Sequence, residues 1–335
     1  MKALITGGAG FIGSHLAEAL LAREHEVLVL DNLSSGRLDN ILPLQAHPAF
    51  RFVLGSILDE GAVNDLAARC DVIYHLGAAV GVRLIVEHPV DTIETNVKGT
   101  EVVLEAALRH GRKTFISSSS EVYGKEVPGH GKFRESDDLT FGTSLRFSYA
   151  SAKALDEYLA RAYFREKGLP VVIGRFFNTV GPRQSAAYGM VVPRLVEQAL
   201  LGRPVTVHGD GEQLRTFTWV GDAVSATVDL METPAAVGEI FNIGSDEAIT
   251  INDLARRILR LAESRSEITH VPYEEVFGAG FEDPRSRVPD ISRLRQTVGY
   301  RPTLSLDEIL ERVITDTRAR LSGGNAHADA PAGRR

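Results

Sequence analysis

The chain has 335 residues, of which 44% are apolar and 24% are charged, and its net charge at pH 7 is −7. This is the composition of a globular protein with one large domain or two lobes, and the lack of a basic block argues against a nucleic-acid partner. A single cysteine, Cys70, rules out an intrachain disulfide and fits a reducing compartment. The glycine-rich first residues are not typical of a signal peptide, and no run reaches the roughly 20 apolar residues of a membrane span. We therefore expect a soluble, cytoplasmic protein without a membrane partner.

Short apolar runs alternate with amphipathic stretches through the first half of the chain. The predicted strands are residues 2–6, 26–31, 50–56, 71–78, 113–119 and 170–178. The predicted helices between them include residues 14–25, 93–111 and 148–168. Nearly continuous apolar strands that alternate with helices are typical of a parallel sheet covered on both faces. The sequence therefore predicts an α/β fold with a doubly wound parallel sheet, the Rossmann architecture, over residues 1–180.

The pattern loosens after about residue 180 into short strands, helices and turns rich in proline and glycine. We expect residues 181–320 to form a smaller C-terminal α/β lobe. Residues 215–245 include a predicted helix at 221–232 and a predicted strand at 239–245, which are expected to return to the main sheet. Residues 321–335 lack bulky apolar side chains and are expected to be a disordered tail.

A glycine-rich segment lies between the first predicted strand and the first predicted helix, with the pattern Gly8-x-Gly10-x-x-Gly13. Gly7 adds a second glycine spacing. Such glycines allow a tight turn and the close approach of a pyrophosphate, which the helix N-terminus attracts with its free N–H groups. Asp31 ends the second strand, where an acid can bind ribose hydroxyls and would repel a 2′-phosphate. The segment therefore predicts NAD rather than NADP, while this loop alone leaves a flavin open.

Tyr149 and Lys153 are four residues apart in a predicted helix, so both lie on one face of that helix. A lysine beside a tyrosine stabilises the phenolate and lowers the pKa of the phenol, which makes the tyrosine a usable base near neutral pH. An ordinary amphipathic helix gives the same spacing. The catalytic interpretation is favoured because the dinucleotide loop and a serine-rich strand end, SSSSEVYG, precede the pair.

These motifs resemble those of the extended short-chain dehydrogenase/reductases, in the group of nucleotide-sugar epimerases, dehydratases and decarboxylases. The segments that carry the resemblance, in the family's order, are TGGAGFIG, DNLSSG, NVKGT, SSSSEVYG, YASAK, RFFNTVGPRQ, VHGDGEQLRTFTWVGD and RVPD. The resemblance implies an NAD-dependent enzyme that modifies a UDP-sugar through a 4-keto intermediate. In that scheme Ser119 binds the sugar 4-hydroxyl, Tyr149 takes its proton, and Lys153 also holds the nicotinamide ribose.

The resemblance also assigns the contacts of the cofactor. By position in the family motifs, they come from Gly7, Gly10, Phe11, Ile12, Gly13, Asp31, Asn32, Ser56, Ile57, Leu76, Ala78, Asn96, Tyr149 and Lys153. The chain departs from the family at Ser56, where an Asp often meets the adenine, and at Gly77, where Ala is usual.

The residues after Ser119 distinguish the reactions of this group. The 4,6-dehydratases typically carry Asp-Glu there, whereas this chain has Ser120 and Glu121, so the acid for that elimination is missing. A 4-epimerase needs only the Ser, Tyr and Lys, and Glu121 is surplus to its chemistry. The pattern resembles that of the UDP-glucuronate decarboxylases, also called UDP-xylose synthases. A 4-keto glucuronate is a β-keto acid that loses CO2 through an enolate, and Glu121 is expected to steer its carboxylate or to help return a proton to C5.

Arg215 resembles the arginine that the decarboxylases place at the substrate carboxylate, which a guanidinium can bind through two parallel hydrogen bonds. The preferred reaction is therefore the conversion of UDP-glucuronate to UDP-xylose and CO2. A 4-epimerase of a UDP-hexose or UDP-uronate is the first alternative, since Ser119 stands where the decarboxylases usually have Thr. A dehydratase is less favoured, and a non-catalytic NAD-sensing protein would have no need of Ser119, Tyr149 and Lys153 together.

The remaining matches concern the nucleotide sugar and the assembly. By resemblance, the substrate contacts come from Asn178, Val192, His208, Arg215 and Arg287. Asn178 and Arg287 are expected at the diphosphate, and His208 is expected to stack on the uracil. No metal site is predicted, because the histidines show no metal-ligand spacing. Family members often dimerise through two helices, here near 92–110 and 147–167, so we expect a homodimer.

Overall fold

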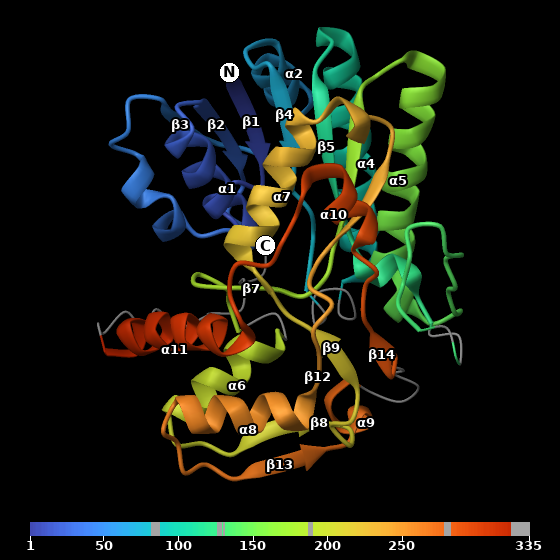
Figure 1. Cartoon of the computed structure of the whole chain (residues 1–335). Helices are drawn as coiled ribbons and strands as arrows, with labels where there is room; N and C mark the ends of the chain where they lie inside the picture. Colours follow the sequence, from blue (N-terminus) through green and yellow to red (C-terminus); the bar gives the residue numbers. More distant parts are fainter. Residues whose placement is uncertain (82–87, 126–128, 130, 187–189, 278–282, 323–335) are drawn as a thin grey trace.

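The computed structural model describes residues 1–81, 88–125, 129, 131–186, 190–277 and 283–322, which form a larger and a smaller lobe (Figure 1). The larger lobe contains a seven-stranded sheet with the strand order β11-β6-β5-β4-β1-β2-β3. These strands are β1 (Lys2–Thr6), β2 (Glu26–Asp31), β3 (Phe50–Leu54), β4 (Val72–His75), β5 (Lys113–Ser119), β6 (Val171–Phe176) and β11 (Ile240–Ile243). Every neighbouring pair is parallel, which confirms the predicted doubly wound fold.

Helices cover both faces of this sheet (Figure 1). One face carries α1 (Phe11–Ala22), α7 (Val220–Glu232) and α10 (Ser292–Val298), and the other carries α2 (Glu60–Ala68), α4 (Pro89–His110) and α5 (Ser148–Lys167). Alternate residues of β1 serve the two cores, since Ala3 and Ile5 pack on the side of α1 and Leu4 packs on the side of α2. Because both faces are buried, the strands read as continuous apolar runs.

Two predicted helices begin earlier than expected. The helix predicted at 93–111 starts at Pro89, because a proline is well suited to the first turn, whose N–H has no helical partner. It ends before Gly111, which adopts the left-handed conformation at φ 65°. The helix predicted at 14–25 starts at Phe11, so the end of the glycine-rich segment is already helical. That shift brings the helix N-terminus to the glycine loop.

The strand order reverses between β1 and β4, and ligands of doubly wound sheets bind in the crevice outside the carboxyl ends of the strands at such a point. β1 runs directly into the glycine loop, and β5, which ends at Ser119, lies beside β4. The topology therefore places the glycine loop and the serine-rich strand end at the same edge of the sheet.

The smaller lobe has its own apolar core, to which α6, α8 and α11 contribute Leu195, Leu254 and Leu310. Its elements are β7 (Thr179–Val180), α6 (Val191–Leu200), β8 (Val205–His208), β9 (Leu214–Thr216), β10 (Thr218–Trp219), β12 (Ala248–Thr250), α8 (Ile251–Leu261), β13 (Ile268–Val271), α9 (Tyr273–Phe277), β14 (Ser286–Arg287) and α11 (Leu306–Ser322). Strand β14 pairs with β9 and sets Arg287 opposite Arg215. The chain enters this lobe after β6, and it returns to the large sheet through α7 and β11.

The segment predicted as a disordered tail, 321–335, lies outside the described residues except for Leu321 and Ser322, which end α11. Within the described ranges, no helix combines the length and the apolar character that crossing a membrane requires.

Candidate active site

The glycine loop has the shape and the donors that a dinucleotide pyrophosphate requires. Gly7 has φ 71°, and a Cβ there would lie 2.7 Å from the backbone nitrogen of Gly77. A Cβ on Gly13 would collide with the Gly7 carbonyl. Helix α1 begins directly after Gly10, and no side chain caps it, so its first N–H groups are available to an anion. The loop therefore fits NAD.

Asp31 ends β2 beside this loop. Its carboxylate accepts hydrogen bonds from the backbone N–H of Ala9 at 2.9 Å and of Leu33 at 2.8 Å. Burial raises the pKa of Asp31, and these amides offset that effect in part. A Cβ on Gly36 would lie 2.8 Å from one carboxylate oxygen, so the glycine keeps that side of the carboxylate open. This position is compatible with the predicted contact to the ribose hydroxyls.

Three polar residues expected at the cofactor bond to the backbone. The Asn96 amide both donates to the carbonyl of Ala79, at 3.1 Å, and accepts from its N–H, at 2.7 Å, so it holds the loop after β4. Asn32 and Ser56 each accept a hydrogen bond from the backbone N–H two residues ahead, which shapes the turns after β2 and β3. These three side chains shape the loops around the predicted cofactor site.

The apolar residues expected at the cofactor flank the glycine loop. Phe11 and Ile12 form the first turn of α1, and Leu76 directly follows β4, where its N–H donates to the carbonyl of Thr6 at 3.1 Å. Ile57 is buried, and Ala78 is half-buried in the segment after β4.

Ser119 and Tyr149 meet where α5 crosses the end of β5. Ser119 is the last residue of β5, and Ser120 is buried in the following turn, η3 (Ser120–Tyr123). The Ser119 side chain interacts with the Tyr149 phenol and lowers its pKa. Lys153 lies one helical turn further along α5 and is buried. The structure therefore brings the predicted serine and tyrosine together beside the predicted lysine.

A buried ion pair holds α5 against the sheet. Arg175 of β6 donates two hydrogen bonds to Glu157 of α5, at 2.8 and 2.7 Å, and Ser118 of β5 donates a third at 2.5 Å. Because Glu157 is in the same helix as Tyr149, this clamp fixes the register between the phenol and the end of β5.

The predicted lowering of the Tyr149 pKa by Lys153 is wrong in this structure. Burial raises the pKa of Tyr149, the Glu121 carboxylate raises it further, and Ser119 lowers it only in part. The Lys153 ammonium donates a hydrogen bond to Asp156 at 3.2 Å, and both side chains are buried. The carboxylate of Asp156 partly neutralises the charge that was expected to act on the phenol.

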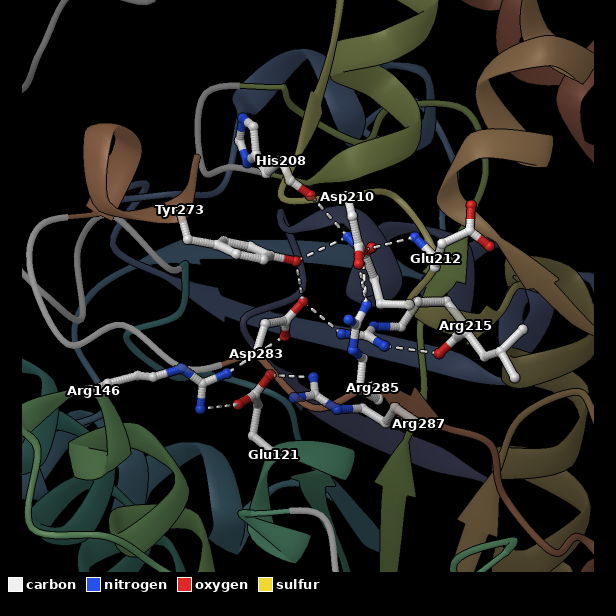
Figure 2. A network of polar contacts seen from close by, with 12 residues as sticks. Glu121, Arg146, His208, Asp210, Glu212, Arg215, Tyr273, Asp283, Arg285 and Arg287 are labelled. Atoms are coloured by element: carbon white, nitrogen blue, oxygen red, sulfur yellow. Dashed lines mark hydrogen bonds and ion pairs between the residues drawn. The ribbon is translucent and has the colours of Figure 1, made fainter. Parts of the chain in front are cut away.

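Glu121 lies between two arginines (Figure 2). It forms a short ion pair with Arg287 of β14, and the Arg146 Nη1 atom lies 3.9 Å from its other oxygen. Burial by itself would raise the pKa of Glu121, but the two guanidiniums outweigh burial and lower it. Glu121 is therefore a carboxylate at neutral pH.

Arg215 has a different partner. It donates to Asp283 at 2.6 Å, and the same carboxylate accepts from the Tyr273 hydroxyl at 2.9 Å (Figure 2). The sequence assigned Arg215 and Glu121 to one substrate carboxylate, whereas the structure sets Arg287, expected at the diphosphate, against Glu121. That pairing was not predicted, because Arg215 and Arg287 are adjacent only once β9 and β14 pair.

The other expected substrate residues lie in the smaller lobe or at its junction with the larger lobe. Asn178 donates to the carbonyl of Thr216 at 2.9 Å, and Val192 is buried in α6. His208 ends β8, and its ring lies edge-on to that of Tyr273 with the centroids 6.5 Å apart. Burial lowers the pKa of His208 to about 4, so the imidazole is neutral and suited to stacking on a base.

Four residues of the site were not identified from the sequence. Asp156 follows Lys153 by three residues in α5, so helical spacing could have found it, whereas Arg146 lies in a separate 3-10 turn, Leu145–Phe147, that precedes α5. Tyr273 and Asp283 had no local signal, because they reach the site only through the packing of the smaller lobe.

Comparison with known proteins shows the family. Residues 3–244 match the model of the family described as NAD dependent epimerase/dehydratase. A UDP-N-acetyl-alpha-D-glucosaminuronate decarboxylase of Bacillus cytotoxicus is 42% identical, over 93% of this chain and 96% of its own. UDP-glucuronic acid decarboxylase 1 of Arabidopsis thaliana is 36% identical, over 96% of this chain and 71% of its own. The solved UDP-glucuronic acid 4-epimerase of Bacillus cereus, in complex with UDP-glucuronic acid and NAD, is 31% identical with a TM-score of 0.85, covering 95% of this chain and 99% of that one.

The doubly wound fold, the glycine loop and the Ser119–Tyr149 contact define an NAD-dependent enzyme of the extended short-chain dehydrogenase/reductase type. The chain belongs to the NAD dependent epimerase/dehydratase family. This result confirms the recognition of the family from the sequence and the prediction of NAD as the cofactor.

Proposed function

We propose that the protein is a decarboxylase of a UDP-linked uronic acid, which it converts to the UDP-pentose and CO2 through a 4-keto sugar. The observation that carries the proposal is the position of Glu121, two residues beyond Ser119 and held between Arg287 and Arg146. An ionised acid clamped by arginines has no use in a simple 4-epimerisation. Such an acid suits a site that binds a substrate carboxylate and then releases it as CO2.

In this proposal Ser119 and Tyr149 act on the sugar 4-hydroxyl. Ser119 binds the oxygen, and Tyr149 takes its proton and later returns it. Bound NAD supplies the hydride exchange at C4. The burial that raises the pKa of Tyr149 also removes water from the reacting oxygen, so the phenol and the serine hydroxyl are the groups left to stabilise charge that develops on it.

The step that follows needs no base at C5. Once C4 is a ketone, the uronate is a β-keto acid, its C5–C6 bond breaks, CO2 leaves, and the electron pair passes from C5 to the C4 oxygen. A proton then adds at C5. Arg287 is the arginine closest to Glu121, so we assign it to the substrate carboxylate and assign Arg215, its neighbour across β9 and β14, to the diphosphate. This exchanges the two roles expected from the sequence.

The sugar itself has two candidates. The resemblance of the sequence favours UDP-glucuronate, the substrate named for the Arabidopsis relatives. The relative at 42% identity is named for UDP-N-acetyl-glucosaminuronate, which differs only by the acetamido group at C2. Both substrates carry the carboxylate that is proposed to lie beside Arg287 and Glu121.

The reaction is tested by incubating the protein with UDP-glucuronate, UDP-N-acetyl-glucosaminuronate and UDP-glucose in separate samples and identifying the products by NMR. We expect CO2 and a UDP-pentose from at least one uronate and no product from UDP-glucose. A C4-inverted product that keeps its carboxylate would show a 4-epimerase instead.

We also infer a homodimer through α4 and α5, which pack side by side in the larger lobe. Ile93 of α4 is 41% exposed, and Leu155 and Tyr158 of α5 are 49% and 61% exposed, so apolar side chains remain uncovered on both helices. The family resemblance assigns a second copy to that face.

The double variant Ile93→Asp/Tyr158→Asp is expected to be monomeric, because it sets charges in the proposed apolar contact. Light scattering coupled to gel filtration would give the mass of two 36.4 kDa chains for the wild type and of one for the variant. Leu201→Asp, an equally exposed apolar residue of the smaller lobe, serves as the control and should remain dimeric. A monomeric wild type would refute the inference.

A further inference from the structure

Asp156 is a buried acid that the proposed mechanism does not use. It lies three residues after Lys153 in α5, and its carboxylate accepts a hydrogen bond from the Lys153 ammonium at 3.2 Å. Lys153 is 1% exposed and Asp156 is fully buried. A buried ion pair of this kind costs free energy to form unless further hydrogen bonds stabilise it. The groups around Asp156 therefore determine whether the pair with Lys153 is stable.

A line of buried polar groups runs from the other side of Asp156 to the dinucleotide loop. The Thr6 hydroxyl lies 2.8 Å from His75 Nδ1, and His75 Nε2 lies 3.1 Å from the Thr100 hydroxyl. The backbone N–H of Gly77 donates to the Thr6 hydroxyl at 3.1 Å. The buried Oδ1 atom of Asp156 has no other hydrogen-bond partner among the described residues, and the Thr100 side chain interacts with this carboxyl and helps to lower its pKa, which burial by itself raises.

The Asp156 end sets the direction of the hydrogen bonds in this line, because a carboxylate can only accept. The single hydroxyl proton of Thr100 therefore points to Asp156, and Thr100 accepts from His75 Nε2. A neutral His75 with its proton on Nε2 accepts at Nδ1 from the Thr6 hydroxyl, which itself accepts from the backbone N–H of Gly77.

This order requires a neutral His75, and the structure provides one. Burial lowers the pKa of His75 to about 3, and the nearby charge of Lys153 lowers it as well. All the side chains of the line, Thr6, His75, Thr100 and Asp156, are fully buried. Every donor therefore points towards the carboxylate that holds Lys153.

We propose that Asp156 is a positioning residue for Lys153, and that the buried line through Thr100, His75 and Thr6 ties that position to the dinucleotide loop. Thr6 immediately precedes Gly7, and Gly77 is the residue that a side chain at Gly7 would meet. The line thus joins the loop proposed to bind the pyrophosphate to the lysine proposed to hold the nicotinamide ribose. The inference rests on the proposed function for the role of Lys153.

Asp156→Asn removes the charge and keeps an oxygen that can accept from Lys153. The affinity for NAD is expected to fall about tenfold, because the ammonium loses the anion that holds it. The acid limb of the pH profile of kcat/KM is expected to move down by about half a pH unit, because the Asp156 charge raises the pKa of Tyr149. The other titratable groups that act on this pair are Tyr149 and Glu157 of α5 and His75 of β4, and Glu121 of η3 acts on Tyr149.

Thr100→Val is the milder second variant, because it removes one hydroxyl and leaves both charges in place. It is expected to lower the affinity for NAD about threefold and to leave the acid limb where it is. Thr100→Ser restores the hydroxyl and should recover the wild-type affinity. The comparison of Thr100→Val with Thr100→Ser tests the proposal even if Asp156→Asn does not fold.

Asp222→Asn is the matched control, since Asp222 is another buried aspartate, lies in α7, and bonds to Thr303 outside the proposed site. It should lower the Tm while the affinity for NAD and the acid limb stay within experimental error of the wild type. Calorimetric titration with NAD and the pH profile with the active uronate are the two readouts. Unchanged NAD affinity in both Asp156→Asn and Thr100→Val, or an acid limb of Asp156→Asn that stays or moves up, would overturn the proposal. If the wild type decarboxylates neither uronate, the proposed function fails, and the calorimetric measurement still decides the role of Asp156.

Discussion

Replacing Tyr149 by phenylalanine is expected to lower kcat about a thousandfold, which corresponds to about 4 kcal/mol of transition-state stabilisation. The phenol is the only proton-transfer group that the structure sets in contact with Ser119 at the end of β5, among the residues described. Loss of one oxygen removes that transfer without opening a cavity, because the ring remains. The change is measured by steady-state kinetics with the active uronate, and the affinity for NAD is expected to stay within about threefold.

Tyr158→Phe provides the control for this variant, because Tyr158 is in the same helix but outside the active site, and phenylalanine keeps its ring in the proposed dimer contact. Its kcat should match that of the wild type. Retention of more than about a tenth of the wild-type kcat by Tyr149→Phe would contradict the assignment of the base and would favour a non-catalytic role for the NAD site.

Arg287→Gln is expected to lower kcat/KM for the uronate by at least about a hundredfold, while the affinity for UDP changes by less than about threefold. Glu121 would lose its ion-pair partner and the substrate carboxylate would lose its proposed one, whereas UDP has no carboxylate and is not affected in this way. Since burial of Glu121 would raise its pKa without Arg287, the variant should also show a steeper loss of activity below neutral pH. The measurements are kinetics over pH and calorimetric titration with UDP.

Arg215→Gln separates the two arginines. It should weaken UDP and the UDP-uronate by similar factors, because its proposed contact is the diphosphate that both share. The opposite result, with Arg215→Gln selective for the uronate and Arg287→Gln not, would restore the roles expected from the sequence. The Tm of both variants shows whether the ion pairs with Glu121 and Asp283 also matter for folding.

Helix spacing predicted part of the site well. Tyr149 and Lys153 lie on one face of α5, and the strand that ends at Ser119 has the predicted bounds, 113–119. The same spacing predicts a contact between Lys153 and Asp156. The prediction for Tyr149 left that contact out, assigned the whole effect of the Lys153 charge to the phenol, and therefore gave its pKa shift the wrong direction. Burial is a tertiary property, and here it dominates the pKa of the phenol.

The features that depend on neighbours along the chain could be predicted from the amino-acid sequence. The alternation of apolar strands and helices, the glycine loop between β1 and α1, and the order of Ser119, Tyr149 and Lys153 were enough to predict the doubly wound fold, the family and NAD. The pairing of the charged side chains, in contrast, depends on how distant segments pack against each other. Glu121 and Arg287 are 166 residues apart, and Arg215 and Asp283 are 68 apart. The first pair forms between the two lobes and the second within the smaller lobe, and this packing leaves no periodic trace in the sequence, whereas helix and strand periods are set within a few residues of backbone.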